Sequence, residues 1–274
     1  MSNENEFKPM NVLLSREELL LVLDLLKTKA IWGLDNDPLG VLDEAQRQWA
    51  VIWASRALRA RQLAQLNEAG ELMVHDALLT AVGTCAYADK AISITHWQAG
   101  EEIPSRYFGH IRGKDIVAHT RPEDVLYLFT LLLSKEELLA QIFDFCEYKD
   151  VPTAAFEMSV ANKHFAQARE LADNGKEEQA VKLLVDNGAE RETAVAFVYT
   201  LTNSTRVSIL QTLKQGESDT LQKNNFTIIQ NDVYIWLIVS VQETGGDALL
   251  IKFVTKSDIE NTLFDWVHFS LGVT

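Results

Sequence analysis

Apolar residues follow two different periods along this chain, and the change of period marks the predicted elements. Helical spacing dominates up to residue 86, and strict alternation, as in half-buried strands, begins at residue 91. In the first half, a strand over 11–14 precedes helices over 15–29, 43–67 and 74–86. Strands over 91–97, 106–112 and 116–119 follow, and a short helix over 120–129 closes this half.

The second half follows the same order. Its predicted helices cover residues 134–148, 158–172, 177–185 and 191–201. Its predicted strands cover 206–213, 226–230, 233–241 and 248–254, and a last helix begins at Thr255. Because helices group with helices and strands with strands, the pattern favours an α+β fold over a βαβ alternation.

Two stretches of the sequence occur twice. Residues 12–19, VLLSREEL, return 119 positions later as LLLSKEEL at 131–138, and both copies hold a Ser-x-x-Glu capping box that predicts a helix start. A second echo links residues 116–129 to 251–264. We therefore predict a duplicated, pseudo-twofold architecture with antiparallel sheets from each half and flanking helical bundles. The halves, 1–130 and 131–274, are expected to pack as one globular unit.

The charge balance narrows the class of partner. The formal net charge is −14, which repels phosphate backbones and argues against nucleic acid as a ligand. A protein partner with a basic segment suits this charge better. The first eight residues lack the basic and apolar regions of a signal peptide, and no apolar run is long enough to span a bilayer as a helix. We therefore expect a cytoplasmic protein that does not insert into membranes.

Candidate catalytic chemistry is sparse. No nucleotide-binding glycine motif, P-loop, zinc-protease or nucleophile-elbow motif occurs, and we predict no cofactor, no metal and no catalytic residue. His110 and His119 lie on neighbouring predicted strands, either as a metal or acid–base pair or as two surface histidines. Cys85 and Cys146 lie in apolar stretches, which is typical of buried reduced thiols.

The predicted helix over 43–67 has two contrasting sides. Its apolar side is predicted to be core, and it carries Trp49, Ile52, Trp53, Leu58 and Leu63. Its other side is basic, and it carries Arg47, Arg56, Arg59 and Arg61. These arginines form either an anion or partner site, or ion pairs with acids of neighbouring elements.

The segment between the first two long strands is the candidate partner-binding loop. It combines an aromatic residue, two acids and an apolar Ile-Pro pair, which are features of docking loops. Its candidate residues are Trp97, Glu101, Glu102, Ile103 and Pro104. Phe156 and Phe165, in the helical cluster over 156–199, are predicted to extend this surface.

One stretch resembles a known family. Residues 54–61, ASRALRAR, followed by Leu63 and Gly70, resemble the A-x-R-x-L-x-A-R-G-L helix signature of EspG-type proteins, the cytosolic chaperones of type VII (ESX) secretion. The glycine of that signature is Gln62 here, and no substrate-binding residue of the family maps onto this chain. The resemblance implies a pseudo-twofold α+β fold with a central antiparallel sheet. It also implies a non-enzymatic role, the binding of a helical secretion substrate.

Three functions remain open from the sequence. The first is a chaperone or adaptor that binds a helical protein through the 97–104 loop and the helical cluster over 156–199. The second is a structural or regulatory subunit of a larger complex. The third is an enzyme or small-molecule sensor with a site between the halves, and it would need converging polar groups such as His110 and His119. The oligomeric state is not predicted.

Overall fold

The computed structural model describes residues 10–28, 31–32, 42–152, 154–215, 221–243 and 246–268. The N-terminal tail over 1–9, most of the loop after Trp32 and part of the predicted turn at 244–247 lie outside these residues. The chain forms two compact units. The first unit comprises Met1–Ser93, Arg106–Leu138 and Thr212–Gln222, and the second comprises Ile94–Ser105, Leu139–Gln211 and Lys223–Thr274. A boundary between residues 130 and 131 stays a prediction.

The chain runs twice through one strand, three helices, four strands and one helix. The first series is β1 (Met10–Ser15), α1 (Arg16–Leu25), α2 (Glu44–Ala60), α3 (Asp76–Ala86), β4 (Lys90–Gln98), β5 (Ser105–Arg112), β6 (Asp115–Glu123), β7 (Leu126–Leu132) and α4 (Lys135–Cys146). A small hairpin of β2 (Ala64–Leu66) and β3 (Leu72–Val74) lies between α2 and α3. The second series is β8 (Glu157–Ala161), α5 (Asn162–Asp173), α6 (Glu177–Asp186), α7 (Arg191–Thr202), β9 (Arg206–Gln215), β10 (Leu221–Gln230), β11 (Ile235–Glu243), β12 (Gly246–Phe253) and α8 (Lys256–His268). The predicted α+β class is confirmed.

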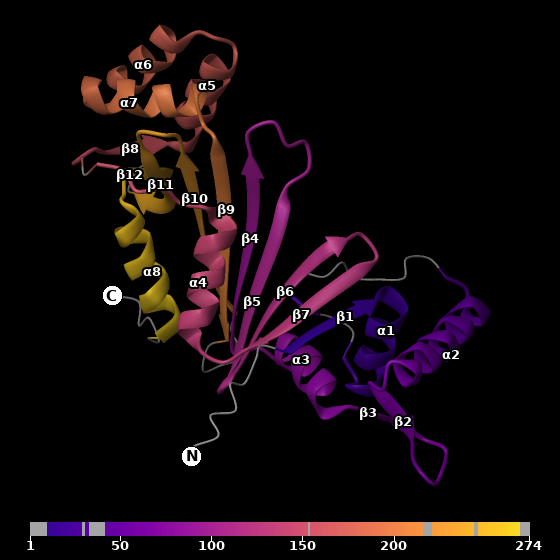
Figure 1. Ribbon diagram of the computed structural model, residues 1–274. Coiled ribbons are helices and arrows are strands. Elements are labelled where there is room, and N and C mark those ends of the chain that lie inside the picture. Colours follow the sequence, from indigo (N-terminus) through magenta and orange to yellow (C-terminus); the bar gives the residue numbers. More distant parts are fainter. Residues whose placement is uncertain are drawn as a thin grey trace, which may run out of the picture. The chain divides into compact units, whose positions relative to one another are not determined.

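In the first unit the strand order is β1-β7-β6-β5-β4. Phe129 of β7 lies opposite Val12 of β1 on one side and His119 of β6 on the other, so all three point to the same face. This face packs in one core with residues of α1 and α3. Figure 1 shows α1 and α2 side by side next to β1.

On the opposite face of the sheet, the first turn of α4 approaches β5. Gly109 of β5 has no side chain where Leu138 of α4 approaches, and an added Cβ would lie 2.8 Å from Leu138 Cδ1 and 3.0 Å from Ile92 Cγ2. The glycine is therefore required by close packing rather than by a turn.

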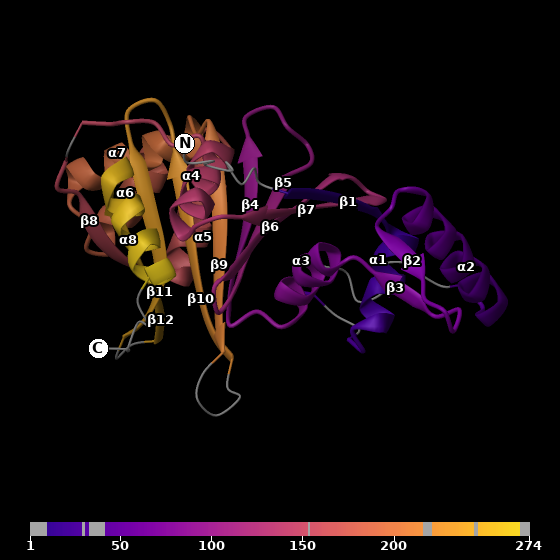
Figure 2. The ribbon, with the colours of Figure 1, turned by 60° about the horizontal axis from the view of Figure 1, so that its bottom comes forward.

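In the second unit the strand order is β4-β9-β10-β11-β12-β8. Alternate residues of β11 point to opposite faces, as strand geometry requires. Trp236 and Ile238 pack in a core with the helices α5, α6 and α7. Leu237 lines the opposite face beside Ile259 of α8. Figure 2 shows α8 on one side of β10–β12, with α5–α7 behind these strands.

Three helices begin with a side-chain cap that the sequence predicts. Ser15 Oγ accepts the Glu18 backbone N–H at 3.2 Å, and Glu18 Oε2 accepts the Ser15 N–H at 2.9 Å. Ser134 caps α4 by accepting the Glu137 N–H at 3.2 Å. Thr255 and Asp258 exchange the same pair of bonds at the start of α8. Each cap satisfies backbone N–H groups that a helix start leaves without a partner.

The predicted helix over 120–129 is wrong, because this segment forms the end of β6 and the start of β7. Pro122, which has no N–H to donate, lies at the register shift between Thr120 and Glu123, where strands tolerate proline. Tyr127 and Phe129 are buried at alternate positions, as in a strand. The second echo therefore does not join equivalent elements, since its other copy runs from β12 into α8.

Two predicted helix boundaries also differ. The predicted helix over 43–67 ends at Ala60 as α2, because Gln62 takes a left-handed conformation with φ +60° and the chain then enters β2. Gly70, at φ +79°, turns the β2–β3 hairpin. The predicted helix over 158–172 starts only at Asn162, because the preceding residues pair with β12 as β8.

The apolar side of α2, predicted to be core, is largely exposed. The exposed fractions of Trp49, Ile52 and Trp53 are 58%, 40% and 59%. The residues that α2 buries are Ala54 and Leu58. Helical spacing alone identified an apolar stripe, but the helix packs on α1 and β2 through a neighbouring face.

Candidate partner-binding surface

The loop between β4 and β5 holds the predicted docking residues within the second unit. Gly100, at φ +89°, permits a tight turn in which the Glu101 N–H donates to the Gln98 carbonyl at 3.0 Å. Glu101 Oε2 accepts the Gln98 N–H at 3.3 Å, so this carboxylate helps to shape the turn. The Ala99 N–H donates to the Thr205 carbonyl at 2.8 Å, which ties the loop to the residue preceding β9.

The tip of this loop presents one apolar side chain to solvent. Ile103 is 81% exposed, the highest value among the large hydrophobic residues that the structure describes. Glu101 and Glu102 beside it are exposed, and Trp97 and Pro104 are half-buried. The loop therefore combines an apolar anchor with two acids and firm backbone attachment, which are properties of a docking loop.

Phe156 and Phe165 are half-buried and pack against the core of the second unit rather than lying at an exposed tip. Phe156 is half-buried, with its ring centroid 6.0 Å from that of Trp236. Phe165 is half-buried, with its ring centroid 6.2 Å from that of Phe197. The structure thus does not show these two rings beside the 97–104 loop.

Two residues that the sequence analysis did not select lie exposed on α7. Val195 is 47% exposed and Tyr199 is 45% exposed, and at i, i+4 they share one side of the helix. The helix leads within a few residues to Thr205, which accepts the hydrogen bond from the loop. Because α7 is apolar on almost all sides, periodicity did not distinguish its outward face from its buried one.

The charges around the loop are arranged in pairs. Arg206 at the start of β9 contacts Glu147 at 2.7 Å, and Lys149 contacts Asp232 at 2.5 Å. The contact with Lys149 lowers the pKa of the Asp232 carboxyl. Arg206 and Lys149 are therefore paired with acids other than Glu101 and Glu102.

His96 of β4 lies beneath this surface and is buried. Its Nδ1 lies 2.9 Å from Ser208 Oγ. Burial, and then the positive charge of Arg206, lower the pKa of His96, while Glu101 and Glu147 oppose the shift. The ring is therefore neutral at pH 7 and serves as a structural link between β4 and β9.

His110 and His119 lie on adjacent strands, as predicted, but neither is on the surface. Both are fully buried, with ring centroids 6.2 Å apart. Their four ring nitrogens have no hydrogen-bond partner among the described residues. Burial lowers the pKa of His110 to about 3, and burial, His110 and Arg121 lower that of His119. Stacked Phe108 and Phe129 flank His119, so the pair is packed as core.

Other candidate reactive groups are also inaccessible. Cys85 and Cys146 are free and buried, and burial raises the pKa of the Cys146 thiol to about 11. A thiol held protonated in this way is a poor nucleophile. Within the described ranges, no group of three or more His, Cys, Asp or Glu residues is placed to hold a metal ion.

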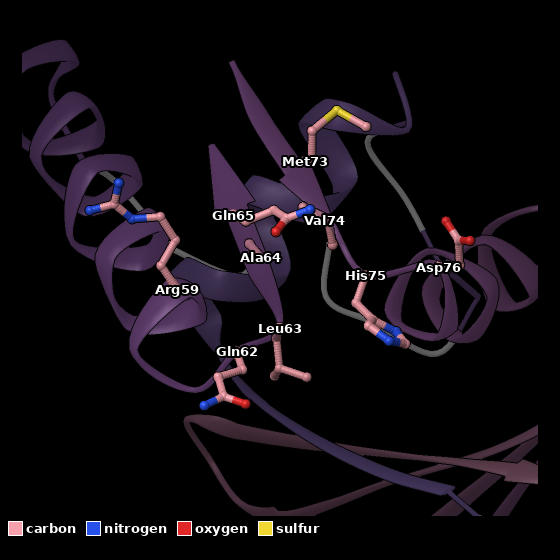
Figure 3. Close-up of a pocket in the computed structure, with 9 residues that line it drawn as sticks. All are labelled: Arg59, Gln62, Leu63, Ala64, Gln65, Met73, Val74, His75 and Asp76. Atoms are coloured by element: carbon pink, nitrogen blue, oxygen red, sulfur yellow. The ribbon is translucent and has the colours of Figure 1, made fainter. Parts of the chain in front are cut away.

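A separate groove of about 580 Å³ lies within the first unit, between the end of α2, the β2–β3 hairpin and the start of α3. Figure 3 shows Arg59 on the α2 side and His75 and Asp76 on the α3 side. His75 Nδ1 accepts the Ala77 N–H at 3.2 Å and caps α3, so this imidazole has a structural use. The charged residues that line the groove are Arg59 and Asp76.

Comparisons with known proteins support the fold. No family model matches the chain, and no curated protein sequence matches it. Among solved structures, it is similar to the Mycobacterium tuberculosis type VII secretion system chaperone EspG5, solved in complex with the PE25–PPE41 dimer. The TM-score is 0.66 at 11% sequence identity, over 93% of this chain and 96% of that chain. The two proteins thus share a fold, as the resemblance of residues 54–61 implied. In the part of the chain that the structure describes, no helix is long and apolar enough to cross a membrane.

Proposed function

We propose that this chain is a non-enzymatic cytoplasmic chaperone or adaptor that binds a helical protein partner. The observation that carries the proposal is the fold shared with EspG5 over almost the whole of both chains. EspG5 was solved bound to a protein dimer, and a shared fold makes a protein partner the first function to test here.

The surface proposed for the partner comprises Ile103 at the tip of the β4–β5 loop and the Val195–Tyr199 pair on α7. Each of these side chains is exposed in a chain that otherwise buries most of its large apolar residues. At protein interfaces a few residues supply most of the binding free energy, and tyrosine is one of the residue types enriched among them. Glu101 and Glu102 would accelerate association with a basic segment of the partner.

The test is capture of partners from the native host with a tagged chain, compared between the unmodified protein, Ile103→Asp and Val125→Asp. Val125 is an exposed turn residue of the first unit and serves as the matched control. We expect one or two helical proteins to be recovered with the unmodified chain and with V125D, and to be lost with I103D. If all three proteins recover the partner equally, Ile103 is not part of the partner-binding surface. If the tagged chain is recovered without any partner, the proposal is contradicted.

The same experiment distinguishes a chaperone from a permanent subunit. A chaperone releases its partner, so the exported or assembled partner should be found without this chain. If the chain remains in a stoichiometric complex with the mature partner, it is a structural or regulatory subunit instead.

A further inference from the structure

β1 is the outermost strand of the first unit and pairs with β7 alone among the described strands. Two hydrogen bonds identify the backbone groups that point to its outer edge. The Ser15 N–H donates to Glu18 Oε2, and the Leu13 carbonyl accepts from Arg61 Nη2. Because the backbone groups of alternate residues in a strand point to the same side, those of Asn11 and Leu13 face the outer edge together with the Ser15 N–H.

The sequence of β1 makes this outer edge a potential template for another strand. Its six residues, MNVLLS, include no charged side chain and no proline. Met10 and Leu13 are 37% and 39% exposed. Natural proteins commonly protect an exposed apolar edge of this kind with a charged side chain. The edge strand of the second unit, β8, carries such a charge itself on the exposed Glu157, whereas β1 depends on a charge from another element.

Arg61 supplies that charge from the residue that follows α2. Its Nη1 donates to both oxygens of the Glu18 carboxylate, each at 2.9 Å, while its Nη2 donates to the Leu13 carbonyl. The planar guanidinium can make these contacts together because its donors form a rigid fork. A strand that added to β1 would need the Leu13 carbonyl for its own N–H group. It would therefore have to displace a guanidinium that is held by a buried carboxylate.

We propose that Arg61 is an edge-protecting residue, whose ion pair with Glu18 keeps the outer edge of β1 closed to a further strand. Without this ion pair, β1 of a second copy of the chain would add to the edge in antiparallel orientation. A second copy is the expected occupant because each molecule presents the same uncharged strand, and a twofold axis can pair that strand with itself. The proposal concerns the first unit and does not depend on the proposed function.

The first experiment measures the mass of the full chain by sedimentation equilibrium for the unmodified protein, Glu18→Gln/Arg61→Met and Glu18→Gln alone. A glutamine at position 18 still has an oxygen for the Ser15 N–H, and it leaves no buried charge unpaired when Arg61 is removed. Between about 1 and 300 μM, the mean mass of E18Q/R61M should rise about twofold or more above that of the unmodified chain. E18Q alone keeps the guanidinium on Leu13 and should match the unmodified chain.

Two outcomes of this experiment overturn the proposal. The first is a mass of E18Q/R61M that equals that of the unmodified chain at every concentration. The second is association of E18Q alone to the same extent as the double variant. Circular dichroism confirms that each variant is folded. Glu18→Met/Arg61→Met, in which apolar side chains replace the ion pair, is a second variant with the same expected association.

A control separates the open edge from a general loss of stability. Val117→Ala removes packing from the core of the first unit and leaves β1 and Arg61 unchanged. V117A should therefore not associate more than the unmodified chain at concentrations where E18Q/R61M does. If V117A associates as strongly as the double variant, destabilisation explains the result and the proposal is overturned.

The second experiment tests whether the contact lies at β1. The Leu13 N–H faces away from β7, so Leu13→Pro removes a donor that an added strand needs and keeps the pairing with β7. Adding L13P to E18Q/R61M should return the mass to that of the unmodified chain. Hydrogen exchange checks the same point without a proline, since the Leu13 amide of E18Q/R61M should exchange more slowly at high concentration than at low. Association that persists with L13P, or exchange at Leu13 that does not depend on concentration, overturns the proposal.

Discussion

Acidification should destabilise this protein through its buried histidine pair, and His110 provides the magnitude. In the unfolded chain a histidine titrates near 6.5, whereas burial lowers the pKa of His110 in the folded chain to about 3. Between these two values the unfolded state binds a proton that the folded state does not. The stabilising contribution is therefore fully present above pH 6.5 and is lost progressively as the pH falls towards 3.

The decrease in the free energy of unfolding depends on the pH at which it is measured. At pH 5 the solution is about 1.5 pH units below the unfolded pKa, and each pH unit corresponds to about 1.4 kcal/mol. Protonation of His110 in the unfolded chain should therefore cost about 2 kcal/mol of unfolding free energy between pH 7.5 and pH 5. His119 acts in the same direction, because burial is also the main cause of its lowered pKa.

The assay is urea unfolding, followed by tryptophan fluorescence at both pH values, for the unmodified chain, His110→Leu and Val117→Ala. Val117 lies directly opposite His110 in the sheet and is fully buried, so V117A removes packing but no titrating group. The unmodified chain and V117A should lose about 2 kcal/mol more than H110L on acidification. Because all carboxylates are common to the three proteins, their contributions cancel. His119 is also common to them, and the main cause of its lowered pKa is burial, to which His110 only adds.

The result that would refute this reasoning is equal acid sensitivity of the unmodified chain and H110L. Equal sensitivity would mean that His110 is protonated in the folded chain near pH 6, through a partner or a water that compensates for its burial. NMR titration of the His110 ring provides an independent check, and we expect no change in its chemical shift above pH 5.

Three further changes test local features. Gln62→Gly should stabilise the chain by about 0.5–1 kcal/mol, because glycine adopts φ +60° without strain, while Gln62→Ala should not; thermal unfolding measures both. Thr200→Val should cost about 1–3 kcal/mol in urea unfolding, because its Oγ1 accepts the buried Trp236 Nε1–H at 3.0 Å. Gly109→Ala should cost about 1–3 kcal/mol by overpacking against Leu138, and Leu138→Ala in the same chain should reduce that cost in the same assay.

The helix starts were predictable from the sequence because their causes are local. Each cap is a hydrogen bond from the backbone N–H of one residue to a hydroxyl oxygen three residues earlier. The hydroxyls belong to Ser15, Ser134 and Thr255, so four consecutive residues are enough to predict each cap. The prediction of a helix over 120–129 was wrong because the structure of this segment depends on distant residues. Its Thr-Arg-Pro-Glu-Asp start resembles a helix N-terminus, but its structure is decided by pairing with β1, more than a hundred residues away.

The candidate surface was predictable only in part. The 97–104 loop was identified because a glycine, two acids and an exposed apolar residue interrupt two clear strands. Val195 and Tyr199 were missed, since exposure on an apolar helix depends on which neighbours cover it. Trp49 and Trp53 were assigned to the core for the same reason. Composition reports how much apolar surface a helix has, whereas tertiary packing decides which part of it faces water.

The attachment of α2 has a consequence for how this protein can change over evolutionary time. Just beyond the end of the helix, Arg61 Nη1 donates to both oxygens of the buried Glu18 carboxylate, each at 2.9 Å, and this carboxylate also completes the cap of α1. Ala54 and Leu58 supply the buried apolar contacts of α2. Since so few positions fix the helix in place, most of its remaining residues are free to vary without loss of the fold. New binding specificities can therefore arise on this helix by point substitution, independently of the strands that form the body of the protein.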